Sequence, residues 1–231
     1  MQIKVAFGNL IVLYDVSVKP IDLVIVGAGG FGREVLDVIN AVNLKSESWN
    51  FLGFVADSRP SLELLDALHA RWLGSVDEVL QSIEPVSYVV GIGSPIDRRR
   101  VAKKFNAAGW QAATLIHPNA TIGADVEISV GSVICSHASI TTHVRLGSHV
   151  HVNLNSTVGH DCIIGDFVTI NPLVAVSGDV ELGSGVTMGT HSSILQGRRV
   201  GADSIVGAGA VVVNDVPTNT TVVGVPAKPL G

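Results

Sequence analysis

The sequence predicts two fold classes in one chain: a small Rossmann-like α/β domain with a parallel sheet, followed by an all-β left-handed parallel β-helix. Two observations carry this prediction. From Ile116 onward every sixth residue is aliphatic or Met for nearly a hundred residues, a register that neither an α-helix nor a single strand keeps. Ahead of this repeat, an apolar strand-like segment runs into a glycine-rich turn and an amphipathic segment, as in a βαβ unit.

The six-residue repeat defines the β-helix over residues 115–217. Its seventeen leading positions run from Ile116 to Val212 without a slip. Four places after each of them comes a small or β-branched residue, with Arg198 as the one clear exception. Three short strands then make one coil of 18 residues, with the first and fifth hexad positions turned inward. Residues 18 apart are therefore predicted to stack on successive coils.

Residues 20–114 predict a small parallel sheet with Rossmann-like connectivity. A strand at 21–26 leads into Gly27-Ala28-Gly29-Gly30-Phe31-Gly32, a G-x-G-x-x-G turn ahead of a predicted helix at 33–42. Such a turn lets a phosphate approach the helix N-terminus. Asp57 ends the second predicted strand, at the distance of a ribose-binding acid. Glycines that serve only helix–sheet packing are the alternative.

This domain is too small for a complete dinucleotide site, because about ninety residues make one mononucleotide-binding half rather than two. An NAD-dependent dehydrogenase is disfavoured for that reason. Residues 1–19 form an extra apolar, alternating segment, for which an added edge strand and an unstructured leader are both open. Residues 218–231 are predicted to be a C-terminal tail.

Composition and charge argue against several classes of protein. The formal net charge of −5 leaves no basic footprint for nucleic acid. No apolar stretch approaches the ~18–20 residues of a membrane span. No basic region with a cleavage site opens the chain, so the cytoplasm is the expected compartment. Cys135 and Cys162 lack zinc spacing and are expected to be reduced packing residues.

Several motifs, in their order along the chain, resemble one bacterial family. They are the glycine turn and the segments 91–93, 115–118, 153–161 and 224–228. The family is the bacterial sugar acyltransferases, which include sialic acid O-acetyltransferases and N-acetyltransferases of nucleotide-linked 4-amino sugars. The resemblance covers about residues 20–231. It implies a homotrimer that takes a nucleotide-sugar and acetyl-CoA, with acetyl-CoA along the coils.

The resemblance also implies roles for individual residues. His160 would be the general base and Asp161 the carboxylate that raises its basicity. The nucleotide-sugar would contact Gly29, Gly30, Phe31, Asp57 and Asn153. Acetyl-CoA would contact Gly178, Thr190, Ala208 and Thr169.

The 18-residue spacing points to the acetyl-CoA positions by a separate route. His160 falls under Gly178, which has no Cβ to crowd an incoming group and whose N–H could stabilise an oxyanion. Thr190 stacks with Ala208 on a line suited to a pantetheine arm. The expected mechanism is direct acyl transfer, in which His160 takes a proton from the attacking amine or hydroxyl. It requires no Cys or Ser nucleophile.

Two positions depart from the family pattern. Phe31 stands where many members carry His, and it cannot donate a hydrogen bond to a sugar or phosphate. The acceptor sugar is therefore expected to differ. Thr169 stands where many members carry a second His, nine residues after the base. In place of the imidazole, the Thr169 hydroxyl is the polar group at this position that could reach CoA.

The favoured function is acetylation of the amino group of a nucleotide-linked amino sugar, for glycan or surface polysaccharide biosynthesis. Sialic-acid-type O-acetylation is the first alternative. A trimeric β-helical metal hydrase and a non-catalytic nucleotide-sugar-binding protein are further ones. His137, His143 and His149 share one hexad phase but fall on three faces of their coil, so they cannot meet at a metal within one subunit. No metal is predicted.

Overall fold

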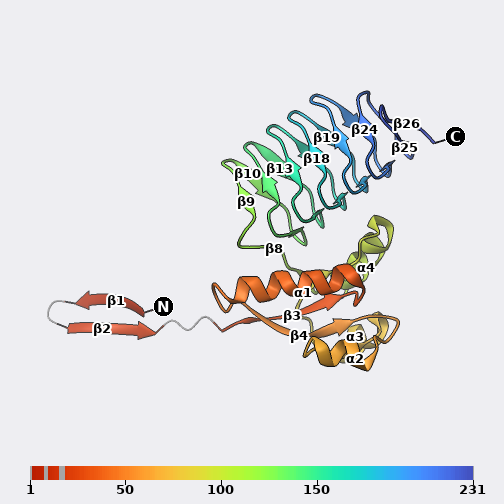
Figure 1. Ribbon diagram of the computed structural model, residues 1–231. Helices are drawn as coiled ribbons and strands as arrows, with labels where there is room; N and C mark the ends of the chain where they lie inside the picture. Colours follow the sequence, from red (N-terminus) through yellow and green to blue (C-terminus); the bar gives the residue numbers. More distant parts are fainter. Residues whose placement is uncertain (1, 8–9, 16–18, 231) are drawn as a thin grey trace.

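The chain folds as an α/β domain that lies along one side of a parallel β-helix (Figure 1). The computed structural model describes residues 2–7, 10–15 and 19–230. Both predicted fold classes are confirmed. Ahead of them, β1 (Gln2–Phe7) and β2 (Leu10–Asp15) pair as an antiparallel hairpin. Among the described residues this hairpin shares no sheet with any other strand, so it is neither of the two structures expected for residues 1–19.

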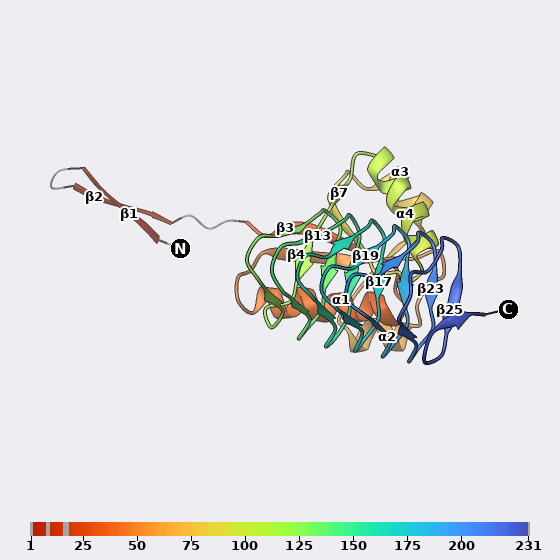
Figure 2. The same cartoon turned by 90° about the horizontal axis from the view of Figure 1, so that it is seen from above.

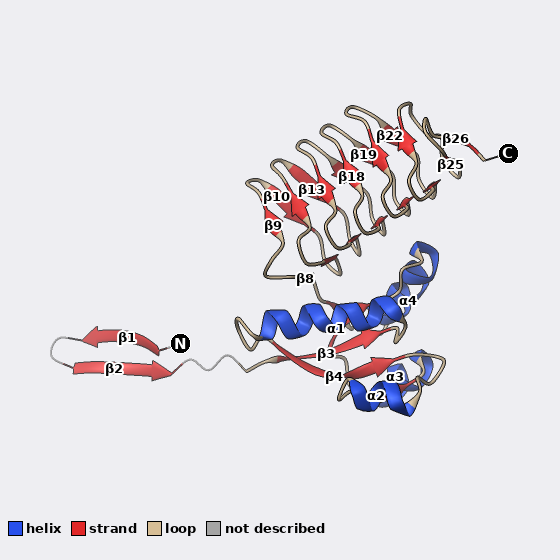
Figure 3. Cartoon of the chain, in the orientation of Figure 1, coloured by secondary structure: helices blue, strands red, loops and turns tan. Residues whose placement is uncertain are grey.

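The α/β domain has one five-stranded parallel sheet with the order β5-β4-β3-β6-β7. Its strands are β3 (Ile21–Val26), β4 (Trp49–Val55), β5 (Trp72–Gly74), β6 (Ser87–Val90) and β7 (Gln111–Ala112). Its helices, drawn in blue in Figure 3, are α1 (Gly30–Asn43), α2 (Leu62–Ala67), α3 (Val76–Ser82) and α4 (Pro95–Ala107). The last four residues of β3 are buried, as expected for the central strand of a covered parallel sheet.

Local sequence sets where these helices begin. Ser75 and Glu78 form a capping box at the start of α3, which satisfies two backbone N–H groups reciprocally. Ser94 caps α4, whose first residue is Pro95. The N-cap residue of α1 is Gly29, which has no side chain. The free N–H groups at the start of α1 therefore receive no capping hydrogen bond from that residue.

The β-helix has three sheets, which we call faces I, II and III in the order in which the chain visits them. Face I contains β8 (Leu115–Ile116), β11 (Val133–Ile134), β14 (His151–Val152), β17 (Thr169–Ile170), β20 (Thr187–Met188), β23 (Ile205–Val206), β25 (Thr221–Val223) and β26 (Lys228–Pro229). Face II contains β9 (Thr121–Ile122), β12 (Ser139–Ile140), β15 (Thr157–Val158), β18 (Ala175–Val176), β21 (Ser193–Ile194) and β24 (Val211–Val212). Face III contains β10 (Val126–Ile128), β13 (Val144–Leu146), β16 (Ile163–Ile164), β19 (Glu181–Leu182) and β22 (Arg199–Val200).

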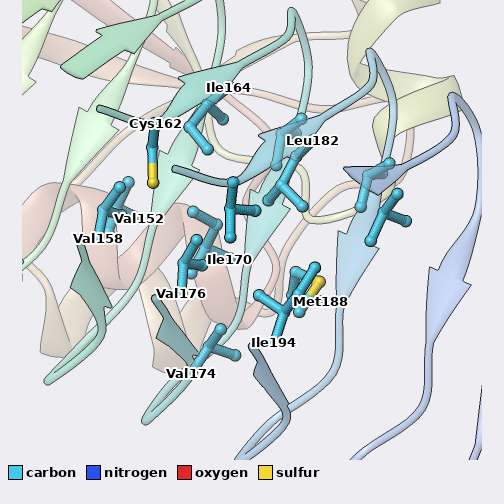
Figure 4. Packing of buried hydrophobic residues seen from close by; sticks show 14 of the residues in the cluster. Val152, Val158, Cys162, Ile164, Ile170, Val174, Val176, Leu182, Met188 and Ile194 are labelled. Atoms are coloured by element: carbon cyan, nitrogen blue, oxygen red, sulfur yellow. The ribbon is translucent and has the colours of Figure 1, made fainter. Parts of the chain in front are cut away.

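The interior of the β-helix is filled by the two hexad positions predicted to face inward. Figure 4 shows these aliphatic side chains packed against one another inside the β-helix, together with Cys162 and Met188. The parallel register pairs residues 18 apart, for example Val158 with Val176. Arg198 is the exception in structure as in sequence, because its guanidinium points outward and lies 3.9 Å from Asp215.

The stack continues past the predicted boundary at residue 217. β25 pairs in parallel with β23, and β26 folds back on it in antiparallel fashion. Val222 in β25 is buried at 3% exposure, so this last pair of strands covers the open end of the apolar core. The segment from 218 onward is therefore part of the β-helix rather than a separate tail.

The α/β domain covers the first coils of face I. In Figure 2, which shows the molecule from above, the coils follow one another across this domain from β13 towards β25. Four outward residues of this face, Leu115, Val133, His151 and Thr169, are at most 3% exposed, whereas Ile205 further along is 47% exposed. No helix among the described residues has the length and apolar character needed to cross a bilayer.

Candidate active site

His160 and Asp161 lie at the corner between faces II and III, in the turn from β15 to β16. Asp161 adopts a left-handed backbone conformation with φ 62°. Its Oδ2 lies 2.7 Å from His160 Nδ1. Because an ionised carboxylate only accepts hydrogen bonds, Nδ1 carries the proton and Nε2 keeps its lone pair. The pair thus has the tautomer that a general base requires.

Hydrogen bonds hold Asp161 in its charged form. The bond from His160 lowers the pKa of this carboxyl most, and a second bond, from His143 Nδ1 to Asp161 Oδ1 at 2.7 Å, lowers it further. The side chains of His160 and Asp161 are each 51% exposed, so the pair faces solvent at the edge of the prism.

Gly178 lies directly against the His160 ring on the next coil. A Cβ at this glycine would lie 2.5 Å from both Cε1 and Nε2 of the imidazole, so only glycine leaves the ring its place. The stacking of His160 with Gly178 predicted from the 18-residue spacing is confirmed. The Gly178 N–H donates no hydrogen bond within the described part of the chain. It lies beside Gly159, where a Cβ would come within 2.6 Å of the Gly178 nitrogen.

Thr190 and Ala208 stack on each other, but at a different corner from His160. Both lie on the turns that lead from face I to face II, after β20 and β23, and both are exposed. His160 and Gly178 lie on the turns from face II to face III. The line of Thr190 and Ala208 therefore does not run past the base of the same chain, because the width of face II separates the two corners.

Thr169 has an environment that the sequence did not predict. The α/β domain covers it to 3% exposure. Its hydroxyl donates to the carbonyl of Gly93 at 3.0 Å and accepts from Arg98 Nη2 at 2.9 Å. With the hydroxyl engaged between the two domains, Thr169 offers no free group for a contact with CoA.

The glycines of the turn differ in whether the packing of the protein requires them. Gly27 has φ +107°, and a Cβ at Gly32 would collide with the Gly27 carbonyl, so these two are required for the turn and its packing. Gly29 is exposed, and a Cβ there would meet no atom within 4 Å. Packing therefore does not require a glycine at position 29, which lies beside the uncapped start of α1.

The other predicted sugar contacts have partners within the protein. Phe31 packs on His151 of face I, with ring centroids 4.5 Å apart. Asp57 is exposed, and its Oδ1 accepts a hydrogen bond from the N–H of Val76 at the start of α3. Asn153 is 4% exposed and donates to the carbonyl of Ile170 on the next coil, at 2.9 Å.

The two halves of the predicted site lie on opposite sides of the β-helix. The glycine turn and Phe31 lie against face I, whereas His160 lies at the corner between the other two faces. In a triangular prism that corner is opposite face I. One chain by itself therefore does not bring His160 to the glycine turn.

The histidines are arranged as the hexad phase predicts, with His137, His143 and His149 on three different corners. His149 and His151 are buried beneath the α/β domain, and burial lowers the pKa of His149 to about 4. The described residues contain no group of three or more His, Cys, Asp or Glu side chains placed to hold a metal ion.

Sequence reasoning missed two polar residues. His143 lies 18 residues before Asp161, so the same coil arithmetic identifies it as the neighbour of the acid. Arg98 is completely buried and bonds both domains, and no repeat or motif marks it.

Comparison with known proteins bears on this arrangement. Residues 22–105 match the model of the PglD N-terminal domain. The acetyltransferase domain of PglB from Neisseria gonorrhoeae, solved in complex with acetyl coenzyme A, is 31% identical; the match covers 92% of this chain and 100% of that one, with a TM-score of 0.82. The chain belongs to the bacterial sugar acyltransferase family.

A second member of the sugar acyltransferases is similar over the same extent. A variant of perosamine N-acetyltransferase from Caulobacter crescentus, solved with CoA and GDP-perosamine, is 27% identical, and the match covers 93% of this chain and 98% of that one, with a TM-score of 0.82. The curated relatives match over a short segment only. A 2,3,4,5-tetrahydropyridine-2,6-dicarboxylate N-acetyltransferase from Enterococcus faecalis is 54% identical over 43 residues, which is 19% of this chain and 18% of that protein.

Proposed function

We propose that this protein transfers an acetyl group from acetyl-CoA to the amino group of a nucleotide-linked amino sugar. The observation that carries the proposal is the His160 imidazole, hydrogen-bonded to Asp161 through Nδ1 and seated against Gly178 through the edge that bears Nε2. A neutral imidazole with a free Nε2 is suited to take a proton from an attacking amine. The sugar acyltransferase structures that bind CoA and GDP-perosamine support the choice of substrates.

The proposed reaction is a direct transfer. Nε2 of His160 takes a proton from the amine as its nitrogen attacks the thioester carbonyl, and Asp161 stabilises the resulting imidazolium. In this proposal the N–H of Gly178, which has no hydrogen-bond partner among the described residues, donates to the carbonyl oxygen as it gains negative charge. When the C–S bond breaks, His160 gives this proton to the departing CoA thiolate. The products are the amide and free CoA.

The working form is proposed to be a homotrimer with sites between neighbouring copies. Sites shared between copies are supported by the placement of His160 opposite face I, where the glycine turn lies, and of Thr190 and Ala208 at a third location. In a cyclic trimer each copy presents its II–III corner to one neighbour and its I–II corner, which carries Thr190 and Ala208, to the next. The proposed site accordingly comprises His160, Asp161 and Gly178 of one copy, with the other positions supplied by its partner.

The test is a screen of UDP-, dTDP- and GDP-linked 4-amino sugars with acetyl-CoA, read by mass spectrometry. The expected result is one added acetyl group on one of these sugars, equal release of CoA, and loss of turnover by about 10²-fold or more in His160→Ala. Acetylation of a sugar that has hydroxyls but no amine would favour O-transfer instead. Full activity of His160→Ala, or release of no CoA with any of these sugars, would contradict the proposal.

A further inference from the structure

The corner that carries the base also carries a row of acid and imidazole side chains. Asp125, His143, Asp161 and Asp179 occupy the same left-handed position on four successive coils, with φ between 52° and 62°. Because the coils stack in register, side chains at this position lie one above the other. His143 is therefore held between two carboxylates, one on each side along the stack.

His143 binds the oxygen of Asp161 that His160 does not use. Its Nδ1 lies 2.7 Å from Asp161 Oδ1, while His160 Nδ1 lies 2.7 Å from Oδ2. The carboxylate only accepts, so both imidazoles donate to it. On the other side, His143 Nε2 lies 3.7 Å from Asp125 Oδ2, and Arg145 holds Asp125 at 3.0 Å. The result is a continuous row from Arg145 to the base.

We propose that His143 is a positioning residue, which locks the plane of the Asp161 carboxylate so that His160 presents Nε2 to the acceptor amine. The inference rests on the proposed function, in which His160 is the base. With one bond only, the half-exposed Asp161 side chain could rotate together with the imidazole that it holds. A second bond to its other oxygen fixes both torsions, and a base held in place gives a higher rate than one that must be ordered at each turnover.

The same bond has an electrostatic consequence. By donating to Asp161, His143 draws part of the carboxylate's negative charge away from the bond to His160 and helps to lower the pKa of Asp161. The other charged groups around the pair are Asp125, Arg145 and Glu127 towards the N-terminal coils, and Asp179 on the next coil, whose N–H donates to the His160 carbonyl. Within the described residues, only His160 and His143 donate side-chain hydrogen bonds to the Asp161 carboxylate.

The test compares His143→Ala with His143→Asn. Asparagine tolerates the left-handed backbone, and its amide donates from a position close to that of Nδ1. We expect His143→Ala to lower kcat about tenfold with both KM values little changed. We also expect the acid limb of its pH–rate profile to move to higher pH. His143→Asn should restore most of kcat.

Asp203→Ala is the matched control for backbone strain, because Asp203 has φ 55° at the corner between faces III and I. It should lose as much thermal stability as His143→Ala and keep the wild-type pH profile. Wild-type kcat and pH profile in His143→Ala would overturn the proposal, as would equal loss of kcat in the Ala and Asn variants.

A measurement without turnover separates this inference from the proposed function. The mobility of the His160 ring, followed by NMR relaxation in the substrate-free protein, should rise in His143→Ala and stay near the wild-type level in His143→Asn. Unchanged mobility in His143→Ala overturns the positioning role. If the wild-type protein acetylates no amino sugar while the mobility still rises in His143→Ala, the proposed function fails and the coupling of His143 to His160 stands.

Discussion

At the scale of single residues, the II–III corner depends on side chains that are absent as well as on those present. Gly178 has no Cβ where the His160 ring lies, and Gly159 has none beside the Gly178 nitrogen. The ring and the free N–H can approach the same reacting group only because both positions are glycine. Small additions there should therefore affect catalysis more than folding.

Gly178→Ala tests this point. The backbone there accepts alanine, since its φ is not positive, but the new methyl would lie 2.5 Å from two imidazole atoms and must displace the ring. We expect kcat to fall by about 10–10²-fold, measured as CoA release, because a displacement of this size misaligns the base. In a His160→Ala background the same change should have no further effect. A wild-type rate in Gly178→Ala would show that the contact does not matter.

The two cysteines should be unreactive in the native protein. Burial raises the pKa of the Cys135 thiol to about 12 and also raises that of Cys162, and the thiolate is the reactive form. We expect a thiol reagent to label neither residue at mildly alkaline pH and both in guanidinium. Rapid labelling of the folded protein would contradict the burial of these residues, and it would also disturb thiol-based assays of CoA release.

At the scale of structural elements, Arg98 joins α4 to the β-helix. Its guanidinium is fully buried and donates to carbonyls of Ile92 and Gly93 in its own domain. It also donates to the carbonyls of His149, Phe167 and Val168 on the β-helix and to the Thr169 hydroxyl. Burial lowers the pKa of Arg98 to about 9, and the cation is stabilised by these oxygens instead of by a carboxylate.

Arg98→Met should destabilise the folded protein by about 2–4 kcal/mol, because the loss of the guanidinium leaves several buried carbonyls without a donor. The matched control is Arg99→Met, which removes an exposed ion pair with Asp203 and should cost less than about 1 kcal/mol. Urea unfolding measures both free energies. Equal losses in the two variants would refute the role of Arg98 as the link between domains.

The buried His149 should make the domain junction sensitive to acid. Burial lowers its pKa from 6.5 to about 4, so the unfolded chain binds a proton that the folded protein does not. The stabilisation is fully present above about pH 6.5 and is lost as the pH falls towards 4, by at most about 3 kcal/mol. We expect Tm to fall over this interval, and to fall less in His149→Phe, which keeps the stacking on Phe167. The same pH dependence in both proteins would contradict this origin.

At the scale of the whole molecule, the placement of the sites argues for function between copies. The α/β domain occupies face I, and the base lies at the corner opposite to it. One chain keeps its glycine turn and its His160 on opposite sides of the prism, so it does not bring the two to one ligand. Under the proposed function, activity therefore requires an oligomer.

Mixing two inactive variants tests this arrangement. His160→Ala removes the base, and Ala208→Trp blocks the exposed corner proposed to receive acetyl-CoA from the other side. Co-refolded at equal amounts, they should recover about a quarter of wild-type CoA release, since about three quarters of random trimers are mixed and each has one intact site of three. No recovery, or a monomer by light scattering, would contradict sites shared between copies.

Much of the fold was predictable because the β-helix is a local repeat. The hexad pattern predicts the coil, the inward columns and the contact of His160 with Gly178, since each depends only on residues at fixed spacing. The hairpin at β1 and β2 and the closing strand β25 were missed, because neither follows the six-residue period. The resemblance predicts a CoA contact for Thr169, whereas its hydroxyl bonds Gly93 and Arg98. The sequence does not reveal these two partners, because both lie more than seventy residues away in the chain.

The two folds and the stacking of one coil on another follow from the amino-acid sequence alone, because both depend on periodicity along the chain. The pairing of His160 with Asp161 was implied by the resemblance to the family. Which face of the prism the α/β domain covers is a property of the tertiary fold. That choice depends on the buried contacts of Arg98, Phe31 and Thr169 between distant segments. It places His160 on the far side of the prism from the glycine turn.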